Sequence, residues 1–249
     1  GASDFILKPS GAVSADIGKV AHDLVQMVKI YAQRKERKEE KPQNEESTAP
    51  VPVEKKPITI PVKKWQKTPI EVIAIGISTG GPNALRKVLA SLNGNLSLPI
   101  LIVQHMPAGF TAEFAKSLDR ICPLDVKEAE DGDIIKPGRI FIAPGDKHIM
   151  TVQKPLAKTI ALSEDTPVNG HRPSVDILFS SVCEVYGSHC MAIIMTGMGK
   201  DGVNAIGDIY NRGGLTVAQD EASCIVPGMP GTATGRGFIH NIVSLHDMA

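Results

Sequence analysis

A short apolar run that ends at a serine between two glycines limits the folds open to this chain. Residues 72–77 are all β-branched or small and apolar, which predicts a buried strand of a parallel sheet. The run breaks at Ser78, which lies between Gly76 and Gly80, and residues 84–89 then follow with helical spacing. A strand, a tight turn made possible by glycine and a helix form the setting in which Gly-x-Ser-x-Gly presents a nucleophile. The segment therefore predicts an α/β fold and a serine placed to attack a carbonyl group.

Two other interpretations of Ser78 compete with this one. Serine is a preferred N-cap residue, so Ser78 could serve only to cap the helix that follows. A phosphate-binding loop would need Gly-x-Gly-x-x-Gly or Gly-Lys followed by Ser or Thr, and this segment has neither pattern. A catalytic serine also requires a base and an acid from elsewhere in the chain.

Two further apolar runs end in residues suited to those roles. Residues 99–103 lead to His105, and residues 191–195 lead to Asp201. Because the carboxyl ends of parallel strands meet at one edge of a sheet, we expect these side chains to lie near Ser78. Taken alone, His105 could be a hydrogen-bonded structural residue and Asp201 a helix N-cap. Together the three favour a serine triad, whose order along the chain is not fixed by the chemistry.

The remaining pattern alternates apolar strands with amphipathic helices. It predicts an α/β three-layer sandwich around a mainly parallel, doubly wound, Rossmann-like sheet, without a Rossmann function. An antiparallel hairpin is expected to be inserted at 147–163, near Gly132 and Asp133. The expected strands lie near 71–77, 99–103, 139–143, 191–196 and 215–218, and the expected helices near 82–92, 110–121, 174–186 and 202–212.

Composition excludes several classes of function. Basic and acidic residues balance at 27 each, so charge gives no reason to expect binding to nucleic acid. No apolar run approaches the roughly 20 residues that span a bilayer, so no direct membrane insertion is expected. The four cysteines show no Cys-x-x-Cys spacing and are interpreted as reduced thiols of a cytosolic protein.

Histidines lie near aspartates at two places in the sequence, which raises the question of a metal site. His148 follows Asp146, and His171 precedes Asp176, but neither forms a compact ligand set such as His-Glu-x-x-His. We expect no metal and no cofactor. Arg172 and Asp176 are expected to shape the rim of the pocket or to cap the helix at 174–186.

Several long motifs of this sequence resemble those of a known protein family. The stretches Gly-Ile-Ser-Thr-Gly-Gly-Pro at 76–82, Gln-His-Met-Pro-Ala-Gly-Phe-Thr at 104–111 and Met-Thr-Gly-Met-Gly-Lys-Asp-Gly at 195–202 resemble the chemotaxis response-regulator methylesterases, the CheB family. Stretches at 142–148, 170–176 and 218–224 agree. The resemblance covers about residues 70–240.

The resemblance implies a role for each site residue. Ser78 would be the nucleophile, His105 the base and Asp201 the acid, while the backbone amides of Met198 and Thr79 would bind the oxyanion. The implied activity is hydrolysis of glutamate γ-methyl esters, and deamidation of specific glutamines, on the cytoplasmic helices of chemoreceptors. The implied partners are those receptors and a histidine kinase that acts on the receiver domain of the intact protein. A cytoplasmic monomer is implied.

Stretches near the start of the chain extend the resemblance. Residues 4–9 look like the last strand of a phosphoacceptor receiver domain, and apolar residues at helical spacing within 17–28 look like its final helix. We expect three parts: a C-terminal receiver remnant at 1–32, a charged, proline-rich linker at 33–66, and a catalytic domain at 67–249. Because the chain lacks the phosphoacceptor, the remnant is expected to be loosely attached and the enzyme constitutively active. An independent N-terminal dimerisation helix is the alternative.

Two other functions stay open on the sequence. The same triad would suit a general serine esterase or amidase that acts on small molecules. A binding module could also dock receptors or adaptor proteins without performing any chemistry. Hydrolysis of methylated receptor, compared with hydrolysis of p-nitrophenyl esters, separates these functions.

Overall fold

The computed structural model describes residues 24, 25, 28, 29 and 32, and then 64–249 without a break. The expected receiver remnant and linker therefore lie almost wholly outside the described residues, apart from the five early positions, which are helical. Those five belong to a separate unit of the chain. The account below concerns residues 64–249.

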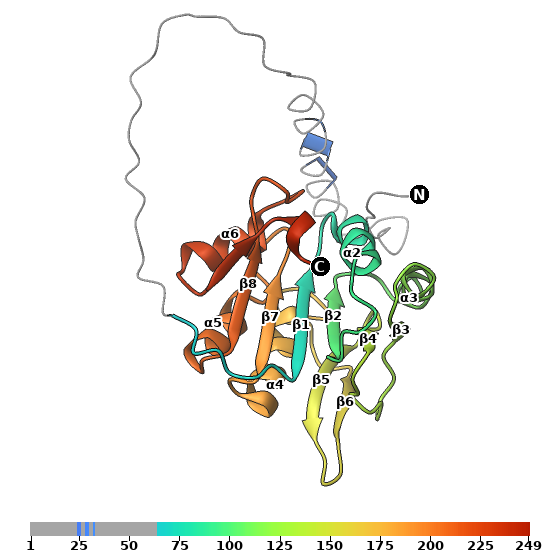
Figure 1. Cartoon of the computed structure of the whole chain (residues 1–249). Coiled ribbons are helices and arrows are strands. Elements are labelled where there is room, and N and C mark those ends of the chain that lie inside the picture. Colours follow the sequence, from blue (N-terminus) through green and yellow to red (C-terminus); the bar gives the residue numbers. More distant parts are fainter. Residues whose placement is uncertain (1–23, 26–27, 30–31, 33–63) are drawn as a thin grey trace, which may run out of the picture. The chain divides into compact units, whose positions relative to one another are not determined.

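A seven-stranded sheet, parallel throughout, forms the centre of this part of the chain (Figure 1). Its strands lie in the order β3-β4-β2-β1-β7-β8-β9. The chain adds strands on one side of β1 first and on its other side afterwards, so the order reverses at β1. In such sheets, ligands bind outside the carboxyl ends of the strands at the point of reversal. The strands are β1 (Val72–Ile77), β2 (Ile100–Gln104), β3 (Asp125–Glu128), β4 (Arg139–Ile142), β7 (Cys190–Ile194), β8 (Leu215–Gln219) and β9 (Asn241–Val243).

Helices cover both faces of this sheet, and β1 shows how the sequence produces this arrangement. Successive side chains of a strand point to opposite faces. Val72 and Ala74 pack into the core beneath α4 and α5, whereas Ile73 and Ile75 pack into the core beneath α2 and α3. The six residues of β1 are all buried, which explains why the strand is apolar without alternation. The helices are α2 (Gly81–Ala90), α3 (Thr111–Asp119), α4 (Val175–Tyr186), α5 (Val203–Asn211), α6 (Gly228–Gly235) and the 3₁₀ turn η1 (Leu245–Asp247).

One glycine sets how closely α4 approaches the sheet. A Cβ atom at Gly76 would collide with Cγ1 of Val175 and lie 2.9 Å from its Cγ2. Val175, the first residue of α4, therefore packs directly against Gly76 near the end of β1. This contact brings the N-terminus of α4 to the carboxyl edge of the sheet.

The expected antiparallel hairpin is present as β5 (His148–Gln153) and β6 (Lys158–Ser163), which extends below the sheet in Figure 1. The segment near Gly132 joins it, as predicted, because Gly132 donates to the carbonyl of Ile160, and Ile160 donates to that of Asp133. The three-layer fold is confirmed. Strands β3 and β9 and helix α6 were not predicted.

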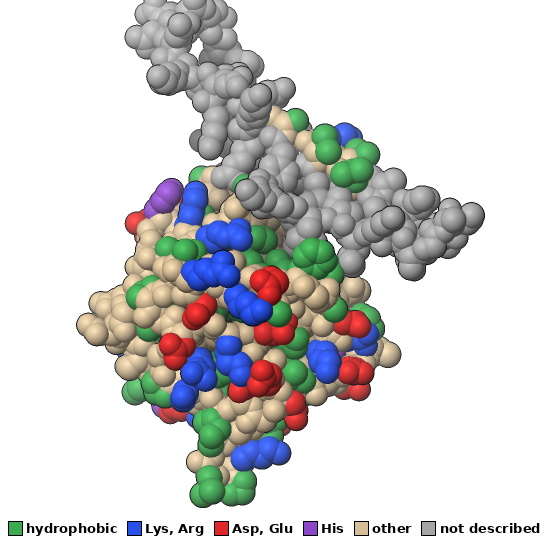
Figure 2. Space-filling view, turned by 90° about the vertical axis from the view of Figure 1, so that its right-hand side faces the viewer, with side chains coloured by type: hydrophobic (Ala, Val, Ile, Leu, Met, Phe, Trp, Pro, Cys, Tyr) green, Lys and Arg blue, Asp and Glu red, His purple; other side chains and the backbone are tan. Residues whose placement is uncertain are grey.

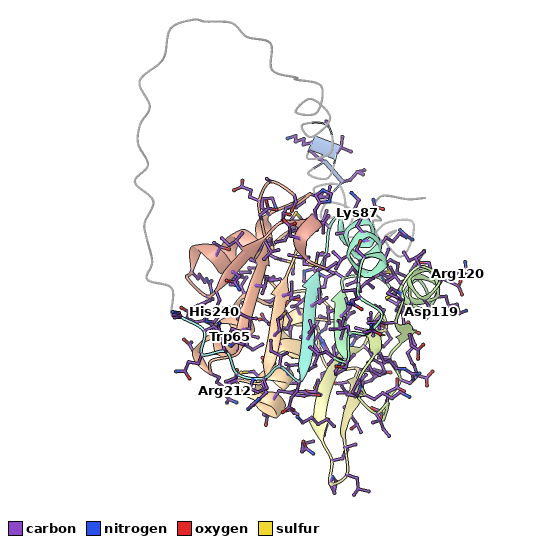
Figure 3. The ribbon with its side chains drawn as sticks, viewed as in Figure 1. Trp65, Lys87, Asp119, Arg120, Arg212 and His240 are labelled. Carbon is purple, nitrogen blue, oxygen red and sulfur yellow. The ribbon has the colours of Figure 1, made fainter. Side chains whose placement is uncertain are left out.

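Charges of both signs alternate over the surface that carries α2 and α3 (Figure 2). Lys116 pairs with Glu113 and Arg139 with Asp125. The carboxylate of Asp119, at the end of α3, accepts a hydrogen bond from the Val126 amide and so ties α3 to β3 (Figure 3).

All four cysteines are free thiols. Within the described residues, no helix has the length and apolar character needed to cross a membrane.

Candidate active site

Ser78 occupies the turn between β1 and α2, as predicted, and it does not cap the helix. The N-cap of α2 is Gly80, at a left-handed φ of 79°, and no side chain caps that end. The Ser78 amide donates to the carbonyl of Thr196, and its own carbonyl accepts from the Gly81 amide. Backbone bonds therefore hold the turn, and the serine hydroxyl is not needed for them.

The loop after β7 lies directly against this turn. A Cβ atom at Gly197 would lie 2.8 Å from Cβ of Ser78 and would collide with the sulfur of Met229. Only glycine fits at position 197, because the two backbone segments approach each other so closely there. The Thr196 hydroxyl adds a bond of 2.9 Å to the carbonyl of Thr79. The Ser78 turn and the segment that leads to Asp201 are thus packed as one unit.

His105 and Asp201 form a buried pair at the same edge. Nε2 of His105 lies 2.8 Å from Oδ2 of Asp201, and the two side chains are 8% and 0% exposed. The His105 amide donates to the carbonyl of Ile77, which fixes His105 next to the last residue of β1. Because Nε2 faces a carboxylate, it carries the proton, and Nδ1 keeps its lone pair. Nδ1 is buried and has no hydrogen-bond partner among the described residues.

Asp201 accepts further hydrogen bonds from the start of α4 and the loop before it. Oδ2 accepts from the Val175 amide at 2.7 Å, and Oδ1 accepts from the Ser174 hydroxyl at 2.8 Å and the Asn169 amide group at 2.9 Å. Burial alone would raise the pKa of Asp201, but the bond and charge of His105 together with these donors hold it below its ordinary value. Asp201 therefore stays ionised beside His105.

The structure excludes both of the helix caps that the sequence left open as alternatives. Asp201 does not cap α5, whose N-cap is Gly202 without a side-chain bond. Asp176 does not cap its own helix: its Oδ1 accepts from the Ala205 amide in the first turn of α5. Burial raises the pKa of Asp176, and the charge of Asp201 adds to the shift. The Arg172 side chain pairs with Asp146 instead.

The amides of Thr79 and Met198 are both available as donors. Neither has a hydrogen-bond acceptor in the described part of the chain. In a planar trans peptide the N–H points away from the preceding C=O. The carbonyl of Gly197 accepts from Met229, so the Met198 N–H is turned away from α6. These contacts are compatible with the oxyanion role expected for both amides.

His171, whose sequence context suggested at most a metal ligand, lies beside the candidate site. Its ring stacks on that of His105, with centroids 3.8 Å apart and planes 9° from parallel. Burial, with the nearby His105, lowers the pKa of His171 from 6.5 to about 4. A neutral ring therefore covers one face of His105. No group of three or more potential metal ligands was found among the described residues.

The shifted pKa of His171 predicts a pH-dependent stability. Between pH 6.5 and 4 the unfolded chain binds a proton at His171 that the folded chain does not bind, so stability falls as the pH falls through this window. We expect His171→Phe, which keeps a neutral stacked ring, to reduce the decrease in Tm between pH 7 and 5 by about 2–4 °C. Thermal melts of both proteins measure this. The exposed His246→Phe is the control, and an equal decrease in all three proteins would contradict the assignment.

Fold and site together define a class of protein. Strand β1 pairs with β2 on one side and β7 on the other, so Ser78, His105 and Asp201 follow three adjacent parallel strands. The chain is an α/β enzyme whose candidate site lies at the switch point of a doubly wound sheet. The CheB methylesterase model matches residues 73–249, and the chain belongs to this family.

Individual relatives agree with this assignment. A Treponema denticola protein named protein-glutamate methylesterase/protein-glutamine glutaminase is 49% identical over 266 residues, covering all of this chain and 70% of that protein. A Treponema pallidum protein of the same name is 40% identical over 287 residues, covering all of this chain and 71% of that protein. The crystal structure of the Thermotoga maritima CheB methylesterase catalytic domain matches with a TM-score of 0.70 and 38% identity, over 72% of this chain and 95% of that one.

Proposed function

We propose that this enzyme hydrolyses glutamate γ-methyl esters on the cytoplasmic helices of chemoreceptors, and deamidates specific glutamines there, with Ser78, His105 and Asp201 as its triad. The observation that carries the proposal is the buried His105–Asp201 pair, whose residues follow the two strands on either side of the strand that precedes Ser78. Family membership and the names of the relatives support the choice of substrate.

The first half of the reaction transfers the glutamyl group to the enzyme. Nδ1 of His105 takes the proton of Ser78, because Nε2 is already held by Asp201. The serine oxygen attacks the ester carbonyl, and the amides of Thr79 and Met198 stabilise the resulting oxyanion. His105 then passes its proton to the leaving methoxide, so methanol departs and an acyl-enzyme remains.

The second half restores the enzyme with water. His105 accepts a proton from the water as the water attacks the acyl group, and it returns that proton to Ser78 as free glutamate leaves. Asp201 holds the ring orientation and stabilises the imidazolium in both halves. A glutamine side chain would follow the same course and release ammonia. We also propose that this chain has the three-part division 1–32, 33–66 and 67–249, and that a histidine kinase acts on the receiver domain.

The test is a methanol-release assay. Purified protein is expected to release methanol from membranes that carry methylated chemoreceptors and to act only weakly on p-nitrophenyl acetate. A fluorophosphonate probe should add its mass to the peptide that contains Ser78. Rapid hydrolysis of the small ester without methanol release would favour a general esterase. No methanol and no labelling would favour a binding module.

A further inference from the structure

A buried glutamine connects the ends of the two strands that carry the proposed nucleophile and base. Gln104 is the last residue of β2, and it is 1% exposed. Its Nε2 group donates to the carbonyl of Ser78 at 3.1 Å and to the carbonyl of His105 at 3.1 Å. One carboxamide therefore binds both backbone segments.

The other end of this carboxamide has no partner. Oε1 of Gln104 is buried without a hydrogen bond among the described residues. It lies against Gly81, where an added Cβ atom would collide with it. Reversing the carboxamide would place its oxygen against two carbonyl oxygens, so only the observed orientation is favourable. An unpaired buried acceptor is destabilising. The residue is thus better explained by what Nε2 holds than by fold stability.

The carbonyl that Gln104 holds belongs to the same peptide plane as the Thr79 N–H. Because that plane is rigid and trans, fixing the direction of the Ser78 carbonyl also fixes the opposite direction of the Thr79 N–H. The Gly81 amide is the second donor to this carbonyl, so the plane is held from two sides. The bond to the His105 carbonyl likewise restrains the backbone from which the proposed base extends.

We propose that Gln104 is a positioning residue, which aims the Thr79 amide at the reacting oxyanion and keeps His105 aligned with Ser78. This inference rests on the function proposed above. Gln104 touches no substrate in this role. Its loss should therefore slow the reaction without weakening the binding of the receptor substrate.

The first test replaces the carboxamide by an apolar group of similar length. In Gln104→Met, kcat for methanol release is expected to fall about 10- to 100-fold, because a poorly aimed donor loses much of its effect. KM should change less than about threefold. Tm should stay within a few degrees of the wild type, since the change also removes the unpaired Oε1.

A boronic acid provides a readout that needs no receptor. Phenylboronic acid bonds through boron to Oγ of Ser78, with the serine proton passing to His105, and gives a tetrahedral anion that resembles the oxyanion intermediate. Its affinity is expected to fall by about the same factor as kcat in Gln104→Met. This measurement tests Gln104 even if a different ester proves to be the substrate, in which case only the proposed function fails.

Gln104→Glu gives a second test, because a protonated carboxyl group can still donate one hydrogen bond. Its activity should exceed that of Gln104→Met at low pH, and its deficit relative to the wild type should grow as the pH rises and the carboxyl ionises. Thr216→Val is the control: Thr216 is equally buried, but it bonds His240 on the side formed by α5 and β8 (Figure 3). We expect Thr216→Val to keep its kcat.

Three results would overturn the role of Gln104. The first is a Gln104→Met protein with wild-type kcat and boronate affinity. The second is a loss of kcat in Gln104→Met that is matched by an equal loss in Thr216→Val at a similar decrease in Tm. The third, decisive if Gln104→Met does not fold, is a folded Gln104→Glu protein whose activity relative to the wild type is unaffected by pH.

Discussion

Ser78→Ala is expected to lower the rate of methanol release by about 10⁴-fold or more, with the fold unchanged. The reaction needs the hydroxyl as nucleophile, whereas the turn is held by the backbone amide and carbonyl of Ser78. Alanine keeps both groups and fits wherever serine fits. Methanol release measures the rate, and circular dichroism and thermal melting check the fold.

A serine at the other end of the same helix is the control. Ser91 bonds the carbonyl of Lys87 at the exposed C-terminus of α2, so Ser91→Ala should keep full activity. Ser78→Ala should also lose its labelling by a fluorophosphonate. A folded Ser78→Ala protein with near-normal turnover would show that the proposed triad is wrong.

Asp201→Asn is expected to lower both activity and stability. The NH₂ group of the asparagine would face either the Val175 amide at the Oδ2 position or the Ser174 hydroxyl at the Oδ1 position, so one set of buried donors would lose its acceptor. We expect kcat to fall about 10³- to 10⁴-fold, because the His105 tautomer and orientation are lost. The free energy of unfolding should fall by about 2–4 kcal/mol, because buried donors lose their acceptor.

The ionisation of Asp201 sets the pH range of this experiment. Its pKa is lowered in the folded chain from 3.8, so its contribution to stability is complete above that value and is lost only as the pH falls through the still lower folded pKa. Urea unfolding at pH 7 therefore measures the full effect. Asp208→Asn, on the exposed side of α5, is the control and should match the wild type. An Asp201→Asn protein with wild-type stability would contradict the hydrogen-bond network described here.

The sequence predicted the central strands well because each is buried on both faces. The edge strand β3 was missed because Asp125, Lys127 and Glu128 are polar, and only Val126 carries an apolar side chain into the core. Helix α6 was missed for a different reason. Its sequence, Gly-Met-Pro-Gly-Thr-Ala-Thr-Gly, has low helix propensity, and burial of Met229 and Ala233 stabilises it instead.

The candidate site, too, could be predicted from the sequence only in part. Ser78, His105 and Asp201 could be placed together because parallel strands share one edge, and this needs only the strand pattern. The stacking of His171 on His105 depends on how the loop before α4 folds back, which no local pattern encodes. The cap that Asp176 forms on α5 likewise depends on helix packing. A polar residue that ends an apolar strand is a signal that could have found Gln104.

The strand order also bears on the time at which this protein becomes active during its own synthesis. The ribosome releases the strands on the nucleophile side of the sheet first, and β7 must then add to the free edge of β1 before Asp201 can reach His105. A nascent chain that ends before β7 contains Ser78 and His105 but not Asp201, the acid of the proposed triad. With this triad, we expect hydrolytic activity to be acquired late, once the second half of the sheet is in place.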